Sequence, residues 1–207
     1  MPAYSFFTIK SIGQGIYKEK GSKFLGFAYP VLSENEIKEK IASLKSEYFD
    51  ARHHCFAWML GSEKNQFRAF DDGEPNHSAG DPILGQIRSR NLTNVLVVVV
   101  RYFGGTKLGV GGLIAAYKAA AEDALRNSVV IEKEVIVRIA LSYDYSVTAD
   151  VMRMVKEFDM TIVAQEFKQQ CDLIADVPLR NKEKFEDKVK LLSDLGLPVT
   201  LSYPPTP

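Results

Sequence analysis

The residues with the clearest chemical potential lie in a glycine-rich loop. Five of the nine residues 104–112 are glycine, namely Gly104, Gly105, Gly109, Gly111 and Gly112. The loop follows a run of six apolar residues and Arg101-Tyr102-Phe103, and it precedes an alanine-rich segment expected to be helical over 111–126. Glycines leave room for a ligand near the backbone, and a helix N-terminus offers N–H groups to an anion. This pattern predicts contact with a phosphate or a nucleic-acid backbone.

Three cations and an aromatic pair accompany the loop. Arg101 stands at the carboxyl end of the expected strand, Lys107 is the charge inside the loop, and Lys118 follows one turn into the helix. We predict that these cations bind phosphate together with the five glycines. One ring of Tyr102-Phe103 can stack on a nucleobase, although core packing is the commoner role. A structural role stays open, in which the glycines form a tight turn and let the helix pack closely; neither a Walker A loop nor a Rossmann context is present.

The second candidate is the acidic segment 71–78, which reads DDGEPNHS. Asp71, Asp72, Glu74 and His77 are residue types that bind divalent metals. They are equally typical of an acidic turn with bonds from side chain to backbone. The spacing of a calcium loop is absent, and a hard cation needs four or more converging oxygens. We therefore assign no metal ligand and expect no cofactor, and the role of the motif stays open.

The third candidate is Arg52-His53-His54-Cys55. Adjacent residues of a strand face opposite sides, so His53 and His54 cannot both serve one site if the segment is extended. His53 and Cys55 share a face, but no third residue that would orient them can be named. We therefore assign no catalytic residue, and the roles of the two histidines stay open.

The composition sets limits on the function. The chain has 207 residues, 46% of them hydrophobic, with 26 Lys and Arg against 26 Asp and Glu. It therefore lacks the global positive charge of many dedicated nucleic-acid binders. Cys55 and Cys171 are expected to be buried free thiols. Because we find no signal peptide and no apolar run of about 20 residues, we expect a cytoplasmic protein that does not enter a membrane.

Apolar periodicity and turn residues divide the chain into two α+β domains, 1–130 and 131–207. In the first domain we expect strands at 4–10, 22–31, 54–60, 66–70 and 93–103, and helices at 33–48, 81–90 and 111–126. In the second we expect strands at 135–143, 160–167, 171–177 and 198–203, and helices that begin at Ser146 and Asn181. The order βαββαβ is that of a ferredoxin-like domain. The proline-rich tail 204–207 is expected to be exposed.

Several motifs together resemble the IMPACT/YigZ family. These are GSKF (21–24), ARHHC (51–55), DDGEP (71–75), SAGDPIL (78–84), LTNV (92–95), RYFGG (101–105), LGVGGL (108–113) and AY (116–117). The resemblance spans about 18–126 and implies a two-layer α/β sandwich, similar to the left-handed βαβ domain of a small-subunit ribosomal protein and of elongation factor G. Residues 135–203 are similar to the extra domain of bacterial members, which is like the last, ferredoxin-like domain of elongation factor G.

The resemblance also implies a setting for the function. Eukaryotic relatives regulate translation under stress through a partner protein on the ribosome, using a recognition domain outside this resemblance, so that partner is not carried over. Bacterial relatives are regarded as candidate nucleic-acid or ribosome binders with no established reaction. One departure is Ala115, because relatives often carry Lys or Arg two residues before the position of Tyr117.

Three interpretations follow. Our main prediction is a cytoplasmic protein that binds RNA or the ribosome through the glycine loop and regulates translation. The alternative is a metal-dependent phosphoryl-transfer or hydrolytic enzyme, in which Asp71, Asp72 and Glu74, together with His54 or His77, hold the ion and the glycine loop holds a phosphate. In the third, both motifs maintain the fold, and the function lies on a surface between the domains that the sequence does not mark.

Overall fold

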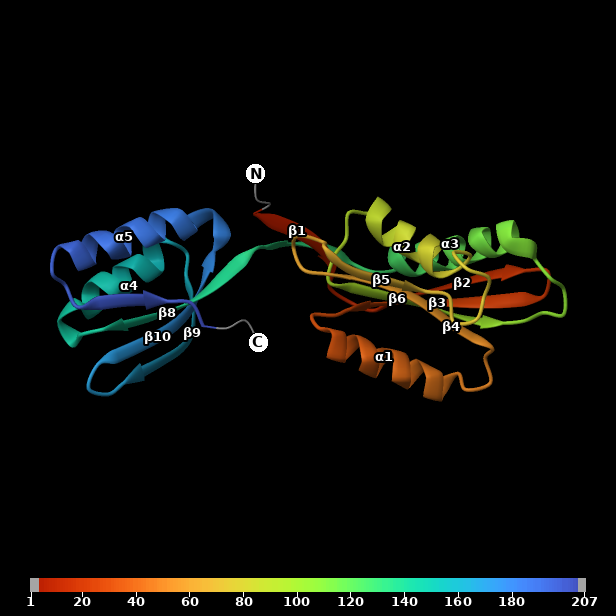
Figure 1. Cartoon of the computed structure of the whole chain (residues 1–207), viewed down its shortest axis with the longest axis horizontal. Helices are drawn as coiled ribbons and strands as arrows, with labels where there is room; N and C mark the ends of the chain where they lie inside the picture. Colours follow the sequence, from red (N-terminus) through yellow and green to blue (C-terminus); the bar gives the residue numbers. More distant parts are fainter. Residues whose placement is uncertain (1–3, 205–207) are drawn as a thin grey trace. The chain divides into compact units, whose positions relative to one another are not determined.

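The α+β class predicted from the sequence is confirmed. The computed structural model, which describes residues 4–204, contains eleven strands in three sheets and five α-helices (Figure 1). These elements belong to two units. One is Ser5–Lys133, and the other consists of Tyr4 with residues 134–204. The end of the tail, beyond residue 204, lies outside the described residues.

The first unit is built on a five-stranded antiparallel sheet in the order β2-β3-β6-β4-β5. Its strands are β2 (Gly13–Glu19), β3 (Ser22–Pro30), β4 (His53–Leu60), β5 (Gln66–Phe70) and β6 (Val95–Tyr102). Its helices are α1 (Glu34–Glu47), α2 (Gly80–Ser89) and α3 (Gly109–Arg126). A separate two-stranded sheet pairs β1 (Ser5–Ile9) with β7 (Val130–Glu134). The strands and helices predicted for this unit are confirmed with ends that shift by no more than two residues.

The central strand β6 explains how the layers form. All six residues of its apolar run, Val95–Val100, are fully buried. The odd-numbered residues pack against α2 and α3, and the even-numbered residues pack on the side of α1. Figure 1 shows α1 on one face of the sheet and α2 and α3 on the other. The expected two-layer sandwich is therefore corrected to three layers, because a continuous apolar strand must be covered on both faces.

The sequence does not predict β2, because Gly13 and Gly15 lower its propensity to form a strand. The structure explains these glycines by the close approach of α3. A Cβ atom on Gly13 would lie 2.1 Å from the carbonyl oxygen of Ala124, and one on Gly15 would lie 2.4 Å from the nitrogen of Ala124. The glycines thus let α3 lie directly on β2, and this contact fixes the position of the helix that begins at the candidate site.

The second unit has the predicted ferredoxin-like order of elements, with an antiparallel sheet in the order β11-β8-β10-β9. Its elements are β8 (Ile136–Tyr143), α4 (Thr148–Glu157), β9 (Thr161–Phe167), β10 (Cys171–Pro178), α5 (Lys182–Asp194) and β11 (Val199–Ser202). The predicted cap at Ser146 is wrong, because a 3-10 turn over Tyr145–Val147 precedes α4. The carboxylate of Asp144 accepts the N–H of Ser146 at 2.8 Å and caps that turn.

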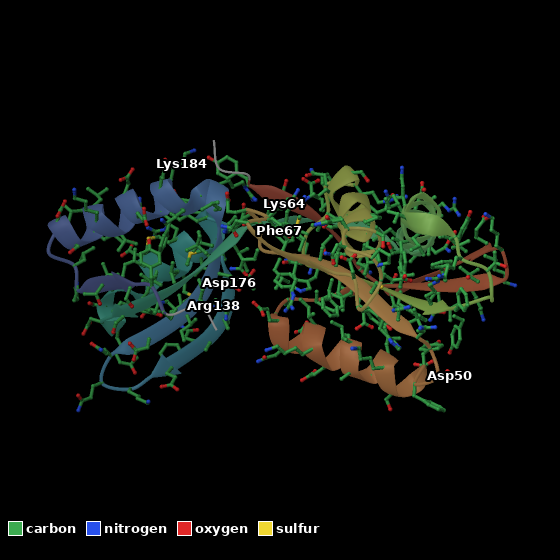
Figure 2. All side chains as sticks on the ribbon, turned by 45° about the vertical axis from the view of Figure 1, so that its right-hand side comes forward. Asp50, Lys64, Phe67, Arg138, Asp176 and Lys184 are labelled. Carbon is green, nitrogen blue, oxygen red and sulfur yellow. The ribbon has the colours of Figure 1, made fainter. Side chains whose placement is uncertain are left out.

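One pair of opposite charges lies on the sheet of the second unit. Figure 2 labels Arg138 on β8 and Asp176 on β10, which lie opposite each other in the strand register. Arg138 Nε and Nη2 donate to the two oxygens of Asp176 at 2.8 and 2.9 Å. The neighbouring residues Ile139 and Leu141 point to the other face, into the core beneath the helices. The bidentate pair holds β8 and β10 in register on this face of the sheet.

Both cysteines are free thiols and fully buried, as the sequence predicts. Cys55 lies in the core of the first unit, and Cys171 lies in the core of the second. None of the helices within residues 4–204 is long and apolar enough to cross a membrane.

Replacing Gly15 with alanine tests the contact between β2 and α3. The added Cβ would collide with the backbone of Ala124, so we expect the free energy of unfolding to fall by about 1–3 kcal/mol. Urea denaturation followed by the fluorescence of Trp58, the single tryptophan and a buried residue of β4, reports on this unit. The control is Gly85→Ala in α2, where the added methyl group meets no atom within 4 Å. This substitution should raise the free energy of unfolding by about 0.5–1 kcal/mol. Equal stability of the two variants would contradict this account.

Candidate functional site

One pocket brings together residues of all three sequence motifs. It has a volume of about 480 Å³ and lies where β6 ends, between the start of β4, the loop before α2 and the start of α3. Its charged, imidazole and aromatic lining comes from Arg52, His53, Glu74, Arg101, Phe103 and Lys107. We call it the Arg101 pocket. The motifs that are separate in the sequence therefore contribute to one site.

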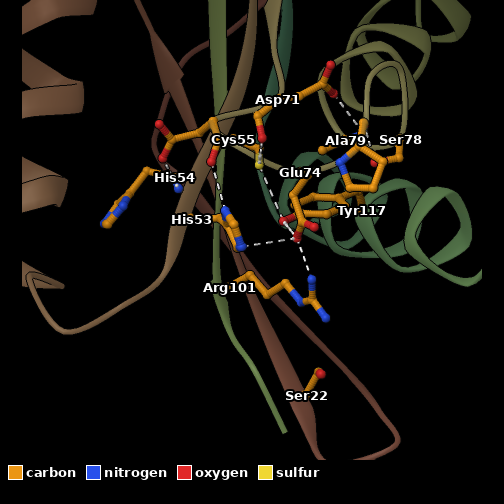
Figure 3. Close-up of polar contacts among 12 residues, drawn as sticks. Ser22, His53, His54, Cys55, Asp71, Glu74, Ser78, Ala79, Arg101 and Tyr117 are labelled. Carbon is orange, nitrogen blue, oxygen red and sulfur yellow. Dashed lines mark hydrogen bonds and ion pairs between the residues drawn. The ribbon is translucent and has the colours of Figure 1, made fainter. Parts of the chain in front are cut away.

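Glu74 and Arg101 form a buried ion pair in this pocket (Figure 3). Arg101 Nη1 lies 2.5 Å from Glu74 Oε1, and the two side chains are only 6% and 4% exposed. The hydroxyl of Tyr117, on α3, donates to the same oxygen at 2.7 Å. Because either charge left alone would be strongly unfavourable here, the pair holds the loop before α2 against the end of β6.

Most donors of Arg101 are not used by the protein. Its Nη1 bonds to Glu74, its Nε is buried without a partner, and no bond within residues 4–204 engages Nη2. The guanidinium carbon lies 5.3 Å from the ring centroid of Phe24 and 5.6 Å from that of Phe103. Such cation–π contacts support the guanidinium. A buried guanidinium that retains free donors beside a pocket is suited to binding a phosphate or carboxylate.

The two histidines of β4 face opposite sides, as strand alternation predicts. His53 lines the pocket, with Nδ1 2.7 Å from the carbonyl oxygen of Asp72 and Nε2 3.9 Å from Glu74 Oε1. His54 points away, as Figure 3 shows, and its ring is not part of the pocket lining. Burial lowers the pKa of His54, and its Nε2 has no hydrogen-bond partner. Only His53 is therefore placed to contact a ligand in the pocket.

Cys55 connects the pocket to the core but is not a nucleophile. Its Sγ lies 3.0 Å from the carbonyl oxygen of Asp71 and 3.3 Å from the hydroxyl of Tyr117. Burial raises the pKa of the Cys55 thiol and also that of the Tyr117 hydroxyl, so both groups are neutral. A neutral, fully buried thiol does not attack a substrate. Cys55 instead packs beneath Tyr117 and supports the bond from Tyr117 to Glu74.

The three carboxylates of the acidic motif diverge. Asp71 caps α2, because Oδ1 accepts the N–H groups of Ala79 and Gly80 at 3.0 and 2.8 Å. Asp72 Oδ2 accepts the backbone N–H of His54 at 2.7 Å and so holds the loop to β4. Glu74 alone lines the pocket. Within residues 4–204, no three His, Cys, Asp or Glu side chains are arranged to hold a metal ion. The geometry therefore does not favour the metal-dependent alternative.

The glycines of the loop have different roles. Gly104 packs against the turn between β2 and β3, where a Cβ atom would lie 1.9 Å from the backbone of Gly21. Gly105 and Gly109 have positive φ angles of 86° and 74°, which glycine adopts without strain. Gly109 is the one of the five that lines the pocket. The other two, Gly111 and Gly112, lie in the first turn of α3 outside the lining.

The first turn of α3 is open to a ligand. No side chain caps it from Leu108, and the turn contains no acidic residue. Its first residues, Gly109 and Val110, line the pocket, so uncapped N–H groups and the positive end of the helix dipole lie at its edge. Lys107 adds a charge next to them, whereas Lys118 is exposed farther along α3 and does not reach the lining.

Two residues of the pocket lining are not assigned to the site by the sequence alone. In the sequence Arg52 stands only at the start of a strand motif, and the structure places it in the lining as an exposed cation. Phe103 is one of two aromatic candidates, and it is the exposed one, with 44% of its surface accessible. Ala115, the position at which the family resemblance leads us to expect a cation, is exposed on α3 outside the lining. The alternation of Tyr102 and Phe103 was the available signal, because Tyr102 packs on the α1 side of the sheet.

The chain is similar to a set of related proteins. A model described as the Impact N-terminal domain matches residues 20–125, a range that contains every residue of the Arg101 pocket. The IMPACT family member YvyE of Bacillus subtilis (strain 168) is 36% identical over 143 residues, which cover 69% of this chain and 66% of that protein. The IMPACT family member YigZ of Escherichia coli (strain K12) is 30% identical over 172 residues, which cover 82% of this chain and 84% of that protein.

A solved structure supports the fold along the whole chain. A crystal structure described as that of a hypothetical protein matches with a TM-score of 0.74 and 26% sequence identity. The match covers 99% of this chain and 100% of the other. Both units of the present fold therefore have counterparts in one solved protein.

The buried pair makes a testable contribution to stability. Arg101→Met is expected to lower the free energy of unfolding by about 3–5 kcal/mol, because it leaves Glu74 charged and buried without its cation. Adding Glu74→Gln should recover part of this loss, since glutamine still accepts a bond from Tyr117 and carries no charge. Chemical denaturation monitored by tryptophan fluorescence measures both variants. Arg52→Met, at an exposed position, is the control and should change stability by less than about 0.5 kcal/mol. A double variant less stable than Arg101→Met would contradict this reasoning.

Proposed function

The chain belongs to the IMPACT family, and from this premise we propose that it is a cytoplasmic RNA-binding protein whose Arg101 pocket binds a phosphate of the RNA backbone. The ribosome is the proposed target, and regulation of translation is the proposed consequence. The proposal is supported by the pocket itself and by the match of the family model to all of its residues. It also agrees with the likeness to domains of translation proteins that the resemblance of the sequence motifs implies.

One observation carries this proposal. Arg101 is buried, it is held in place by Glu74, and it retains donors that no protein group engages. The uncapped start of α3 lies at the same pocket and adds backbone N–H groups. A guanidinium and a helix N-terminus that converge on one cavity are a recurrent way of binding phosphate.

The charges around the pocket are also suited to an anion. Arg52, Arg101 and Lys107 are three cations, against the single carboxylate of Glu74. This local excess of positive charge contrasts with the chain as a whole, which has no net charge. A small positive pocket on a neutral protein fits contact with a few phosphates rather than a long track along the nucleic acid. We therefore expect binding to depend on salt with a shallow slope.

The exposed cations of the pocket allow a direct test. The double variant Arg52→Ala/Lys107→Ala is expected to bind single-stranded RNA and ribosomal subunits about tenfold more weakly, because it removes two phosphate contacts and leaves the buried pair intact. Wild-type affinity should fall with salt, with a slope of log K against log salt of about −1 to −2. Fluorescence anisotropy and co-sedimentation across a salt series measure these effects.

The matched control for this test is Lys38→Ala/Lys118→Ala. It removes the same charge from exposed positions on α1 and α3 that do not line the pocket, so it should bind like the wild type. Equal losses in the two double variants would show a general charge effect and contradict the proposal. Binding that does not change with salt would contradict it as well.

Val110 gives an independent test at the helix start. Val110→Glu places a negative charge in the first turn of α3, which should stabilise the helix by about 0.3–1 kcal/mol and yet repel phosphate from the pocket. We therefore expect stability to be kept or raised while RNA binding falls. Ala115→Glu, exposed on the same helix outside the lining, is the control and should bind RNA better than Val110→Glu. Identical binding by the two variants would argue against a phosphate at the start of α3.

A further inference from the structure

We propose that the Arg101 pocket receives one unpaired ribonucleotide, with its base stacked on Phe103 and a ribose hydroxyl bonded by Glu74 or His53. This inference rests on the proposed function and narrows the ligand from an RNA backbone to single-stranded RNA. It follows from features of the pocket that a phosphate alone does not use.

The pocket offers two unused hydrogen-bond acceptors beside its cations. Arg101 and Tyr117 both donate to Oε1 of Glu74, and no donor among residues 4–204 bonds to Oε2. His53 Nδ1 lies against the carbonyl oxygen of Asp72, which can only accept, so Nδ1 is the donor of this bond. In the neutral form of the ring with this tautomer, Nε2 is an acceptor at the pocket.

These acceptors match a ligand that carries both charge and hydroxyl groups. A backbone phosphodiester has no O–H donor for Glu74 Oε2 or His53 Nε2, and a carboxylate in the ligand would be repelled by Glu74. A ribose phosphate offers anionic oxygens to the cations and a hydroxyl donor to the acceptors. The 2′-hydroxyl is the group by which proteins distinguish RNA from DNA. The pairing of acceptors and cations therefore favours ribonucleotides over deoxyribonucleotides.

Phe103 provides a surface for the base. Its ring is 44% exposed, lines the pocket and lies 5.6 Å from the guanidinium carbon of Arg101. Its neighbour Tyr102 is turned to the other face of β6, where its hydroxyl donates to Asp50 at 2.8 Å. Phe103 is thus the aromatic side chain at the end of β6 that remains available. Stacking on such a ring is how proteins commonly hold unpaired bases.

The dimensions of the pocket favour a single nucleotide. Its volume of about 480 Å³ falls within the usual range of small-molecule sites, about 300–1,000 Å³. In an A-form duplex both faces of a base are covered by its neighbours, so the base cannot reach Phe103. The pocket should therefore select unpaired strands over double-stranded RNA.

The test compares oligo(rU) with oligo(dU) of equal length, which differ at the sugar, and with a double-stranded RNA. Fluorescence anisotropy at one salt concentration should give about fivefold or tighter binding of oligo(rU) than of either other probe. His53→Asn keeps an amide near the position of Nδ1 and removes Nε2. It should therefore reduce the preference for oligo(rU) over oligo(dU) without weakening the binding of oligo(dU). Phe103→Ala should weaken oligo(rU) and oligo(dU) alike by about fivefold or more.

The control for the aromatic variant is Phe49→Ala, whose ring is 83% exposed away from the pocket lining and should not affect binding. Equal affinity for oligo(rU) and oligo(dU), with both still dependent on Lys107, would overturn this inference and leave the proposed phosphate site intact. Equal effects of Phe103→Ala and Phe49→Ala would overturn the stacking role. Loss of salt-dependent binding to every probe would instead overturn the proposed function, and this inference with it.

Discussion

The site depends on the buried ion pair between Glu74 and Arg101. Arg101 is the penultimate residue of β6, a strand enclosed on both faces, whereas Glu74 belongs to a loop without regular structure. Each buried charge is tolerable only next to the other, so the pair fixes this loop to a rigid part of the sheet. Tyr117 of α3 bonds to the same carboxylate oxygen. Three segments far apart in the sequence thus meet at Glu74 Oε1, and the pocket between them is organised before any ligand enters, which lowers the cost of binding.

The carboxylates of the acidic motif have two kinds of role, because two of them stabilise the fold and one lines the pocket. Asp71 caps α2 and Asp72 holds the backbone of β4, so both are fully engaged by the fold. Their bonds place Glu74 at the end of β6, where it orients Arg101. The guanidinium then presents its remaining donors beside the uncapped start of α3. The close packing of the last turn of α3, at Ala124, on the glycines of β2 holds this helix against the sheet. An anion at this place would meet a guanidinium and a helix N-terminus held by independent parts of the core.

Much of this fold could be predicted from local patterns, and the site could be predicted only in part. The apolar run of β6, the alanine-rich α3 and the ferredoxin-like order of the second unit each have a clear periodic signal. β2 does not, because its glycines are required by contact with Ala124 of α3, a residue more than a hundred positions away in the sequence. The same limit applies to the site: the sequence marks Arg101 and Glu74 as chemically interesting, but their pairing depends on tertiary contact. Nor can spacing reveal that Asp71 and Asp72 point away from Glu74, or that Lys118 lies outside the pocket.

The most direct test of the central claim is an NMR titration of the isotope-labelled chain with a single-stranded oligoribonucleotide, following backbone N–H signals. If Arg101 and the start of α3 share one phosphate, the largest, saturable shifts will fall on the N–H groups of residues 107–110, and the guanidinium signal of Arg101 will shift at the same RNA concentration. Saturable shifts confined to residues 134–204, with the signals of Arg101 and α3 unchanged, would contradict it.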